Sequence, residues 1–212
     1  KEFMSEMTNE NKAIKSNWGV FDAQSTTVFL KHLIPEMKFD NPKPINLMKY
    51  LVRVSMGSDG VILDLFSGSA TTSEAVMRVN EEDGGKRKYI AVQIQEKIDT
   101  ETEAYKSGYK NICEIGKERI RRAGDKIKSE SPMTTQDLDI GFRVLKLDDT
   151  NMKDVYYASD DYDQGMLAGL ESNIKEDRTD LDLLFGCLLD WGLPLSLPYK
   201  SEKIDGCTVH TY

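Results

Sequence analysis

Hydrophobic and polar positions change period along the first half of the chain, which predicts helices and strands in turn. Apolar residues recur at helical spacing over residues 45–56, and Pro44 stands where a first helical turn tolerates proline. The continuous apolar run Val61–Phe66 predicts a buried strand, a helical pattern resumes at Ala70, and Lys88–Ile94 is typical of a second strand. This spacing indicates one β-α-β unit with two parallel strands.

A long helix is predicted for residues 108–128, although Gly116 and Gly124 could interrupt it. Its apolar stripe consists of Ile112, Ile115, Ile120, Ala123 and Ile127. Basic residues dominate the remaining positions, namely Lys117, Arg119, Arg121, Arg122, Lys126 and Lys128. This face could touch DNA, but the acidic residues interleaved with it favour a solvated surface.

The remainder of the chain predicts a third strand, two helices and a hairpin. Phe142–Leu147 alternates like a strand with one solvated face, and residues 161–175 have a helical pattern. Thr179–Trp191 predicts a helix that is apolar on two sides, and such a helix is buried on both sides in a core or between subunits. Leu195–Tyr212 predicts a β-hairpin that turns at Asp205-Gly206.

Composition narrows the class of protein. The 212 residues carry a net charge of −8, with 39% apolar and 30% charged residues, as in a globular domain with a real core. No apolar run approaches the length of a membrane span, and no signal-peptide pattern opens the chain. Residues 131–212 carry 7 basic and 16 acidic side chains, so this part is not expected to lie against a phosphate backbone.

The sequence contains few residues that could bind a metal ion or carry out thiol chemistry. The three cysteines are scattered, which indicates reduced thiols in a cytoplasmic protein, and only two histidines are present. Asp148-Asp149 and Asp160-Asp161 are typical of acidic turns rather than a metal site. We therefore expect no metal site.

The stretch with the clearest chemistry is the loop from Asp64 to Thr72, between a strand and a helix. Its small residues let backbone N–H groups approach a ligand, and the helix start adds a positive dipole end. The carboxylate of Asp64 could bind an ammonium or hydroxyl group, so a ligand with a carboxylate, an amine and a ribose would suit this corner. The loop is neither a dinucleotide fingerprint nor a P-loop. A tight turn with a buried aromatic residue is the structural alternative.

Five further segments, together with this loop, resemble motifs of one known protein family. They are N-P-K-P-I-N-L-M (Asn41–Met48), Glu81–Glu96, E-R-I-R-R-A (Glu118–Ala123), G-F-R-V-L-K-L-D (Gly141–Asp148) and D-R-T-D-L-D-L-L-F (Asp177–Phe185). In this order the chain resembles the S-adenosylmethionine-dependent amino-methyltransferases of DNA. More narrowly, it resembles the C-terminal part of the modification (Mod) subunit of type III restriction-modification systems, which are N6-adenine DNA methyltransferases. The resemblance covers most of residues 25–212.

The resemblance implies an α/β fold with a partial Rossmann-like methyltransferase sheet and a C-terminal helical and hairpin extension. Residues 1–24 would be a polar N-terminal segment. Residues 25–150 would be the cofactor-binding half of the methyltransferase domain, and residues 151–212 the acidic extension.

The resemblance also implies the residues that bind S-adenosylmethionine. Those in the loop are Asp64, Phe66, Ser67, Gly68, Ser69, Thr71 and Thr72. Lys43 and Pro44 would lie near the methionine end of the cofactor, Gln93 near the ribose hydroxyls and Ile94 against the adenine. Two positions depart from the pattern: Ala70 replaces a common glycine, and Gln93 is neutral where relatives often carry an acid. Gln93 could equally be a polar residue that merely ends a strand.

The catalytic motif of these enzymes, Asp/Asn/Ser-Pro-Pro-Tyr/Phe, does not occur in the sequence. No catalytic residue is therefore expected, and the chain is interpreted as an inactive cofactor-binding fragment of the enzyme. Implied partners are double-stranded DNA through the full protein, a restriction subunit and a second copy of the chain. Two alternatives are a subunit-assembly module with an empty or incomplete cofactor pocket, and an α/β protein that binds another nucleotide.

Overall fold

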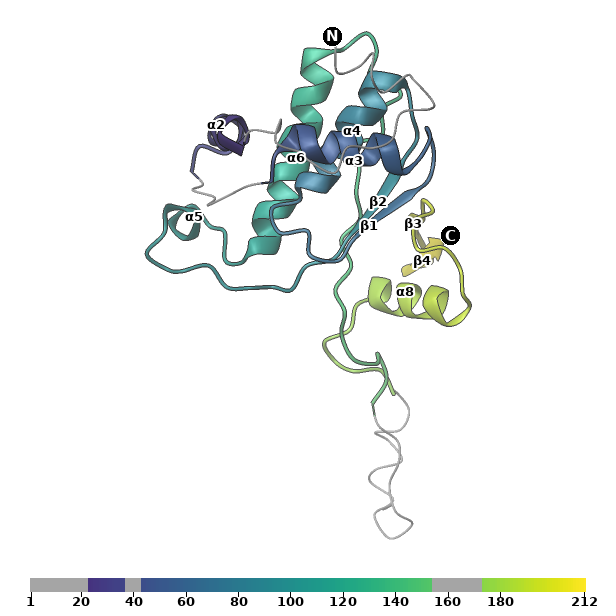
Figure 1. Cartoon of the computed structure of the whole chain (residues 1–212). Coiled ribbons are helices and arrows are strands. Elements are labelled where there is room, and N and C mark those ends of the chain that lie inside the picture. Colours follow the sequence, from purple (N-terminus) through teal and green to yellow (C-terminus); the bar gives the residue numbers. More distant parts are fainter. Residues whose placement is uncertain (1–22, 37–42, 154–172) are drawn as a thin grey trace, which may run out of the picture. The chain divides into compact units, whose positions relative to one another are not determined.

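A computed structural model describes residues 23–36, 43–153 and 173–212. The chain divides into two compact units, Lys1–Gly141 and Phe142–Tyr212. The first contains α2 (Ala23–Leu33), α3 (Ile45–Ser55), β1 (Val61–Asp64), α4 (Thr71–Asp83), β2 (Lys88–Ala91), α5 (Glu103–Lys106) and α6 (Ile112–Glu130) (Figure 1). The second contains α8 (Asp180–Asp190), β3 (Lys200–Ile204) and β4 (Cys207–Thr211).

The β1-α4-β2 unit that the sequence predicts is confirmed. β1 and β2 pair in parallel, with Val61 opposite Lys88 and Asp64 opposite Ala91. Helices α3 and α4 pack against each other and against one face of this pair. The core there consists of Val52, Ala75, Val76 and Val79, with Ile45, Met48, Ile62 and Tyr89 packed around it. The mixed helix and strand content agrees with the expected α/β class.

The opposite face of the β1–β2 pair is apolar and uncovered. Its side chains are 46% to 58% exposed and comprise Val61, Leu63, Leu65, Ile90 and Val92. Parallel strands normally bury both faces, because helices or further layers cover them. The pair therefore has a hydrophobic face that the described residues leave in contact with solvent.

Helix α6 is continuous over 19 residues, so Gly116 and Gly124 do not interrupt it. It lies against α4. Both glycines are buried. The prediction of a solvated basic face is wrong for Arg119, whose side chain is fully buried. Arg119 lies within the buried stripe, three residues after Gly116 and four before Ala123, and this helical spacing places it on the face that meets α4.

In the second unit, α8 and the hairpin are confirmed, but α8 is not buried on two sides within the described part of the chain, because Leu188 is its one buried residue. Thr179 caps α8 in a capping box with Asp182. Asp205 and Gly206 both have positive φ values, 50° and 85°, as a tight turn between β3 and β4 requires. Most of the helix predicted for residues 161–175 lies outside the described residues.

The third strand predicted at Phe142–Leu147 is wrong. This segment forms no ladder with any described strand, so its alternating pattern is not used for pairing. Instead Arg143 donates to the carbonyl groups of Leu195 and Leu197 and stacks over the Phe185 ring, 5.2 Å from its centroid. A strand needs a partner for its backbone, and alternation alone does not supply one.

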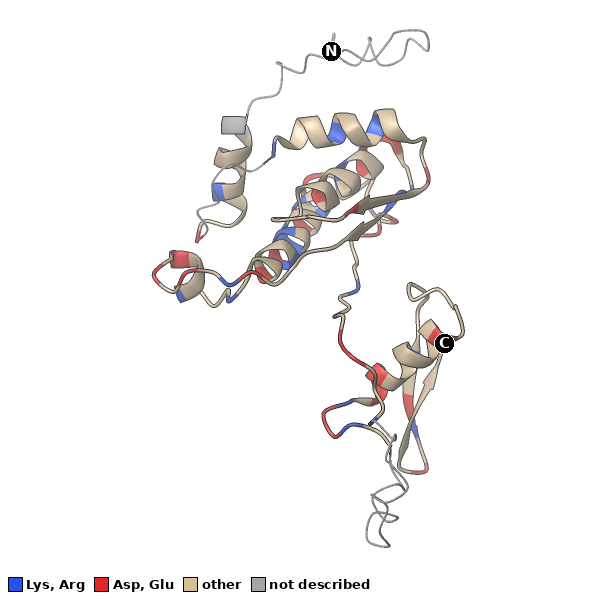
Figure 2. Ribbon diagram, turned by 60° about the horizontal axis from the view of Figure 1, so that its bottom comes forward, with Lys and Arg blue, Asp and Glu red and all other residues tan. Residues whose placement is uncertain are grey.

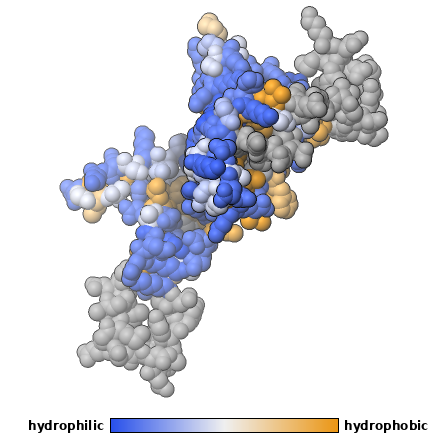
Figure 3. All heavy atoms as spheres, turned by 90° about the vertical axis from the view of Figure 1, so that its left-hand side faces the viewer, coloured by the Kyte–Doolittle hydropathy of each residue, from blue (hydrophilic) through white to orange (hydrophobic). Residues whose placement is uncertain are grey.

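The face of the molecule in Figure 3 is largely hydrophilic, with separate hydrophobic patches. Across the described stretches, no helix is long and apolar enough to cross a membrane.

Candidate functional site

Hydrogen bonds that join the ends of the two strands shape the loop from Asp64 to Thr72. Val92 N–H donates to the Asp64 carbonyl at 2.8 Å, and Ser67 N–H donates to the Val92 carbonyl at 3.1 Å. The Asp64 carboxylate accepts from Phe66 N–H at 3.2 Å and from the Thr72 hydroxyl at 2.5 Å. Asp64 thus ties the end of β1 to the first turn of α4.

Gln93 also holds the loop. Its side-chain carbonyl accepts from Gly68 N–H at 2.7 Å, and its amide group donates to the Ile94 carbonyl at 3.2 Å. Gln93 is therefore more than a polar residue at the end of a strand, because it bonds to the loop that follows the neighbouring strand. One amide hydrogen and one carbonyl lone pair of Gln93 remain for a ligand.

The start of α4 offers unused backbone donors. Within the described part of the chain, the N–H groups of Ser69, Thr71 and Thr72 have no hydrogen-bond acceptor. Ala70, the N-cap residue, lies in the left-handed region at φ 61° and has no capping side chain. Free N–H groups at a helix start favour an anionic group such as a carboxylate.

A buried ionic cluster lies beneath this loop. Arg119 Nε lies 2.8 Å from Glu74 Oε2, and both side chains are fully buried. Arg119 Nη1 donates to Ser69 Oγ at 2.9 Å and to Thr71 Oγ1 at 2.7 Å. Burial lowers the pKa of Arg119, and the charge of Glu74 counteracts that shift. This cluster is absent from the sequence-based prediction, although the position of Arg119 in the apolar stripe of α6 was a signal for it.

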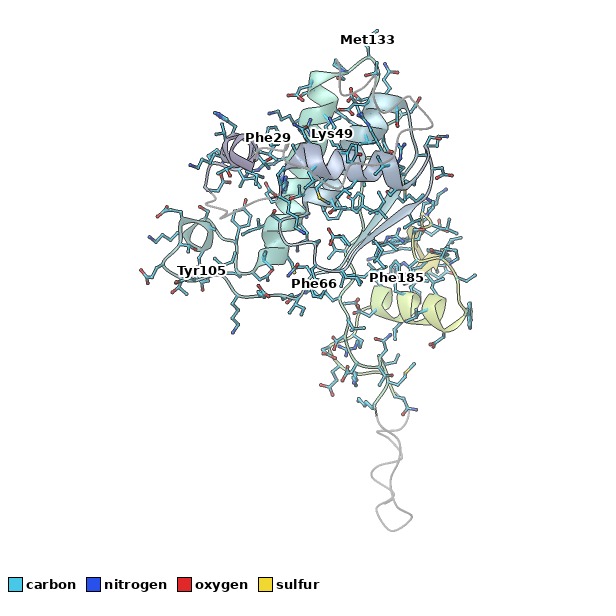
Figure 4. The ribbon with its side chains drawn as sticks, viewed as in Figure 1. Phe29, Lys49, Phe66, Tyr105, Met133 and Phe185 are labelled. Carbon is cyan, nitrogen blue, oxygen red and sulfur yellow. The ribbon has the colours of Figure 1, made fainter. Side chains whose placement is uncertain are left out.

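Two predicted site residues present exposed apolar side chains. Phe66 is 78% exposed and lies beyond the end of β1, and Ile94 is 69% exposed (Figure 4). The alternative of a buried aromatic residue is therefore wrong for Phe66. Next to Ile94, the Cys113 thiol donates to the carbonyl groups of Gln93 and Ile94 at 3.6 and 3.7 Å. Burial raises the pKa of this thiol, so it remains protonated near neutral pH.

Lys43 and Pro44 directly precede α3. Pro44 is the N-cap residue of α3, and Lys43 is exposed. Within the described residues, no hydrogen bond or ion pair joins either of them to the loop. The hydrogen bonds thus connect the loop residues with Gln93 and Ile94.

Many other charged side chains of the described residues form ion pairs. Charges of both signs alternate along α6 (Figure 2), and its basic residues form ion pairs such as Lys117–Glu114 and Arg122–Glu36, both 2.6 Å long. A surface hollow is lined by Lys49, Arg53, Glu82 and Asp83, none of them a predicted cofactor residue. We assign it no ligand, because Glu82 pairs with both of its basic residues.

The acidic turn at Asp148 and Asp149 is likewise paired. Lys175 lies 2.7 Å from Asp149, and Arg178 contacts both aspartates. Across the described ranges, no three histidine, cysteine, aspartate or glutamate side chains are grouped to hold a metal ion.

Comparison with known proteins gives the class. Residues 3–107 match a protein family described as DNA methylase. This range contains the β1-α4-β2 unit and every residue of the predicted cofactor site.

Individual relatives show which kinds of DNA methylase the chain is similar to. The Mod subunit of the type III restriction-modification enzyme StyLTI from Salmonella typhimurium is 47% identical over 105 residues, which are 50% of this chain and 16% of the relative. The EcoPI Mod subunit from Escherichia phage P1 is 32% identical over 210 residues, 94% of this chain and 30% of the relative. The type II methyltransferase M.KpnI from Klebsiella pneumoniae is 30% identical over 127 residues, 58% of this chain and 30% of the relative.

The chain belongs to the family of the Mod subunits of type III restriction-modification enzymes. It matches less than a third of the length of each of these relatives.

Proposed function

We propose that this chain is the cofactor-binding part of an adenine-N6 DNA methyltransferase of a type III restriction-modification system. The observation that carries the proposal is the corner where β1 and β2 end. There the carboxylate of Asp64, the free N–H groups at the start of α4 and the exposed side chain of Ile94 lie on connected segments. Ligands of open α/β sheets bind outside the carboxyl ends of the strands, which is this edge.

The donor set fits S-adenosylmethionine. The N–H groups of Ser69, Thr71 and Thr72 suit its carboxylate, Asp64 suits its ammonium group, and Gln93 retains bonding capacity for the ribose hydroxyls. Ile94 and Phe66 offer apolar surface for the adenine. Lys43 and Pro44 would complete the methionine end. When bound, S-adenosylmethionine supplies the sulfonium methyl group that is transferred to the adenine N6 atom. The chain's own residues would bind and orient it and exclude water.

The methyltransferase sheet would extend beyond β1 and β2. The uncovered apolar face of this pair supports a further helical layer on that face, as in a Rossmann-like domain, because parallel strands are stable when both faces are buried. The catalytic Pro-Pro motif and the target-recognition region would belong to another part of the enzyme, since the sequence contains no adjacent prolines. In this proposal, duplex DNA and a restriction subunit bind the full protein, and the protein acts in the cytoplasm.

A second candidate function, subunit assembly, is favoured by α8. Only Leu188 of this helix is buried, whereas Leu189 and Trp191 are 66% and 75% exposed. A helix with so much exposed apolar surface is suited to contact with a second copy of the chain. In that case the cofactor corner could be empty without loss of the chain's role. Sedimentation of the chain at high concentration tests this: a monomer mass would contradict it.

Ligand preference separates these proposals. The chain would be titrated with S-adenosylmethionine and, in parallel, with ATP. Preferential binding of S-adenosylmethionine supports the methyltransferase proposal, whereas binding of ATP alone would replace it with another nucleotide-binding function. The expected inactivity is tested separately by transfer of a labelled methyl group. Methylation of DNA by the isolated chain would contradict the assignment of the catalytic motif to another part of the enzyme.

A further inference from the structure

The ion pair of Arg119 and Glu74 is fully buried between two helices, where charged side chains are uncommon. Arg119 is on α6 and Glu74 is on α4, and neither side chain reaches solvent. Removing two charges from water is unfavourable, and well-packed apolar residues often stabilise a core as well as an ion pair does. Stability of the α4–α6 contact therefore does not by itself require an arginine here.

The additional contacts of Arg119 all go to the loop. Its Nη1 donates to the Ser69 hydroxyl at 2.9 Å, to the Ser69 carbonyl at 3.3 Å and to the Thr71 hydroxyl at 2.7 Å. These two residues flank Ala70, whose left-handed backbone is unfavourable for a residue with a side chain. Arg119 thus forms hydrogen bonds with the loop on both sides of Ala70, the residue with the unfavourable left-handed backbone.

Helix α6 also meets the loop at Gly116, one turn before Arg119. A Cβ atom at Gly116 would lie 3.3 Å from the Gly68 carbonyl oxygen and 3.6 Å from the Ala70 Cβ atom. The absence of a side chain lets the helix backbone approach the loop closely. The position of α6 therefore determines where Gly68, Ser69 and Ala70 lie.

We propose that Arg119 is a positioning residue for cofactor binding: it holds Ser69 and Thr71 so that the N–H groups of the loop and of the first turn of α4 converge on the ligand. Arg119 lies beneath the loop and contacts no ligand itself. Glu74 orients the guanidinium group and compensates its charge. This inference rests on the proposed binding of S-adenosylmethionine at the loop.

The test compares the full chain with Arg119→Lys, which keeps the charge but cannot reach Glu74, Ser69 and Thr71 together. The matched control is Arg122→Lys, on the same helix, since Arg122 pairs with Glu36 and Glu118 and not with the loop. Two quantities are measured below the melting temperature of every variant. They are the amide hydrogen exchange of residues 67–72 and the affinity for S-adenosylmethionine.

For Arg119→Lys we expect faster exchange confined to the loop and the first turn of α4, and affinity reduced about tenfold or more. Arg122→Lys should leave the affinity within about twofold of the wild type. Uniformly faster exchange throughout α4 and α6 would indicate a merely structural role and overturn the proposal. So would an affinity of Arg119→Lys equal to that of the wild type.

A second variant removes the same contacts from the loop side. The double substitution Ser69→Ala with Thr71→Val leaves Arg119 and Glu74 in place, so it tests the inference if Arg119→Lys does not fold. Unchanged loop exchange in the double variant would contradict the inference. If the wild-type chain binds no S-adenosylmethionine but both variants still loosen the loop, the proposed function fails, and only the contact by which Arg119 holds the loop in place stands.

Discussion

The side-chain carbonyl of Gln93 accepts a hydrogen bond from the backbone N–H of Gly68 at 2.7 Å. Gln93 follows β2 and Gly68 lies in the loop after β1, so one bond connects the ends of both strands. The resemblance to DNA amino-methyltransferases leads us to expect an acidic residue where Gln93 stands. A carboxylate there could accept the same bond, because the oxygen that Gly68 needs is common to both side chains.

Replacement of Gln93 tests whether its hydrogen bond to Gly68 supports cofactor binding and stability. We expect Gln93→Ala to weaken binding of S-adenosylmethionine and to lower the free energy of unfolding by about 1 kcal/mol, because Gly68 N–H loses its acceptor. Gln93→Glu should restore most of both quantities, since it keeps the acceptor oxygen for Gly68 N–H and loses only the weaker bond to the Ile94 carbonyl group. Calorimetric titration and denaturant unfolding measure the two effects. An affinity of Gln93→Ala equal to that of the wild type would exclude this role.

Gly116→Ala tests the close approach of α6 to the loop. Alanine adds up to about 1 kcal/mol of helix propensity, but its Cβ atom would press on the Gly68 carbonyl group. We expect a change in unfolding free energy below about 1 kcal/mol and a several-fold weaker affinity for S-adenosylmethionine. Gly57→Ala is the matched control, because a Cβ atom there meets nothing within 4 Å. Equal affinities of the two variants would show that the approach is unimportant.

Removal of the buried carboxylate should be costly. Glu74→Ala leaves the guanidinium of Arg119 buried without its counter-charge, so we expect a loss of about 3–5 kcal/mol in the free energy of unfolding. The partly exposed pair of Glu114 and Lys117 provides the control, since Glu114→Ala should cost less than about 1 kcal/mol. Urea unfolding of both variants measures the difference. Similar losses would mean that Glu74 is not a buried charge in solution.

The pairing of Glu36 with Arg122 predicts a dependence of stability on pH. The hydrogen bond from Arg122 holds the pKa of Glu36 below its ordinary value of 4.5. Because the folded-state pKa is the lower one, this stabilisation is complete above about pH 4.5 and is lost as the pH falls through the folded-state value. Glu36→Gln should therefore be less stable than the wild type at neutral pH, and the difference should shrink toward pH 3. A constant difference would contradict the linkage.

Much of the first unit could be predicted from the sequence, because periodicity reports which positions face a core. The strand at Val61–Asp64, the helix after Ala70 and the parallel pairing with Lys88–Ala91 all followed from it. So did the hairpin around Asp205-Gly206, where two residues with positive φ fit a tight turn.

Long-range polar contacts could not be predicted in the same way. Arg119 was assigned to a solvated face by its charge, although its spacing places it in the buried stripe of α6. The partner of Gln93 is 25 residues away, and no local pattern indicates such a bond. The strand expected at Phe142–Leu147 failed for the same reason, because alternation does not reveal whether a neighbouring strand exists.

The central claim is that the loop from Asp64 to Thr72 binds S-adenosylmethionine, and calorimetric titration of the chain with this cofactor tests it most directly. Asp64→Ala removes the carboxylate at the end of β1, and Asp59→Ala, two residues before the start of the same strand, is the control. We expect the wild type and Asp59→Ala to bind alike and Asp64→Ala to lose binding. Binding that survives unchanged in Asp64→Ala would contradict the account.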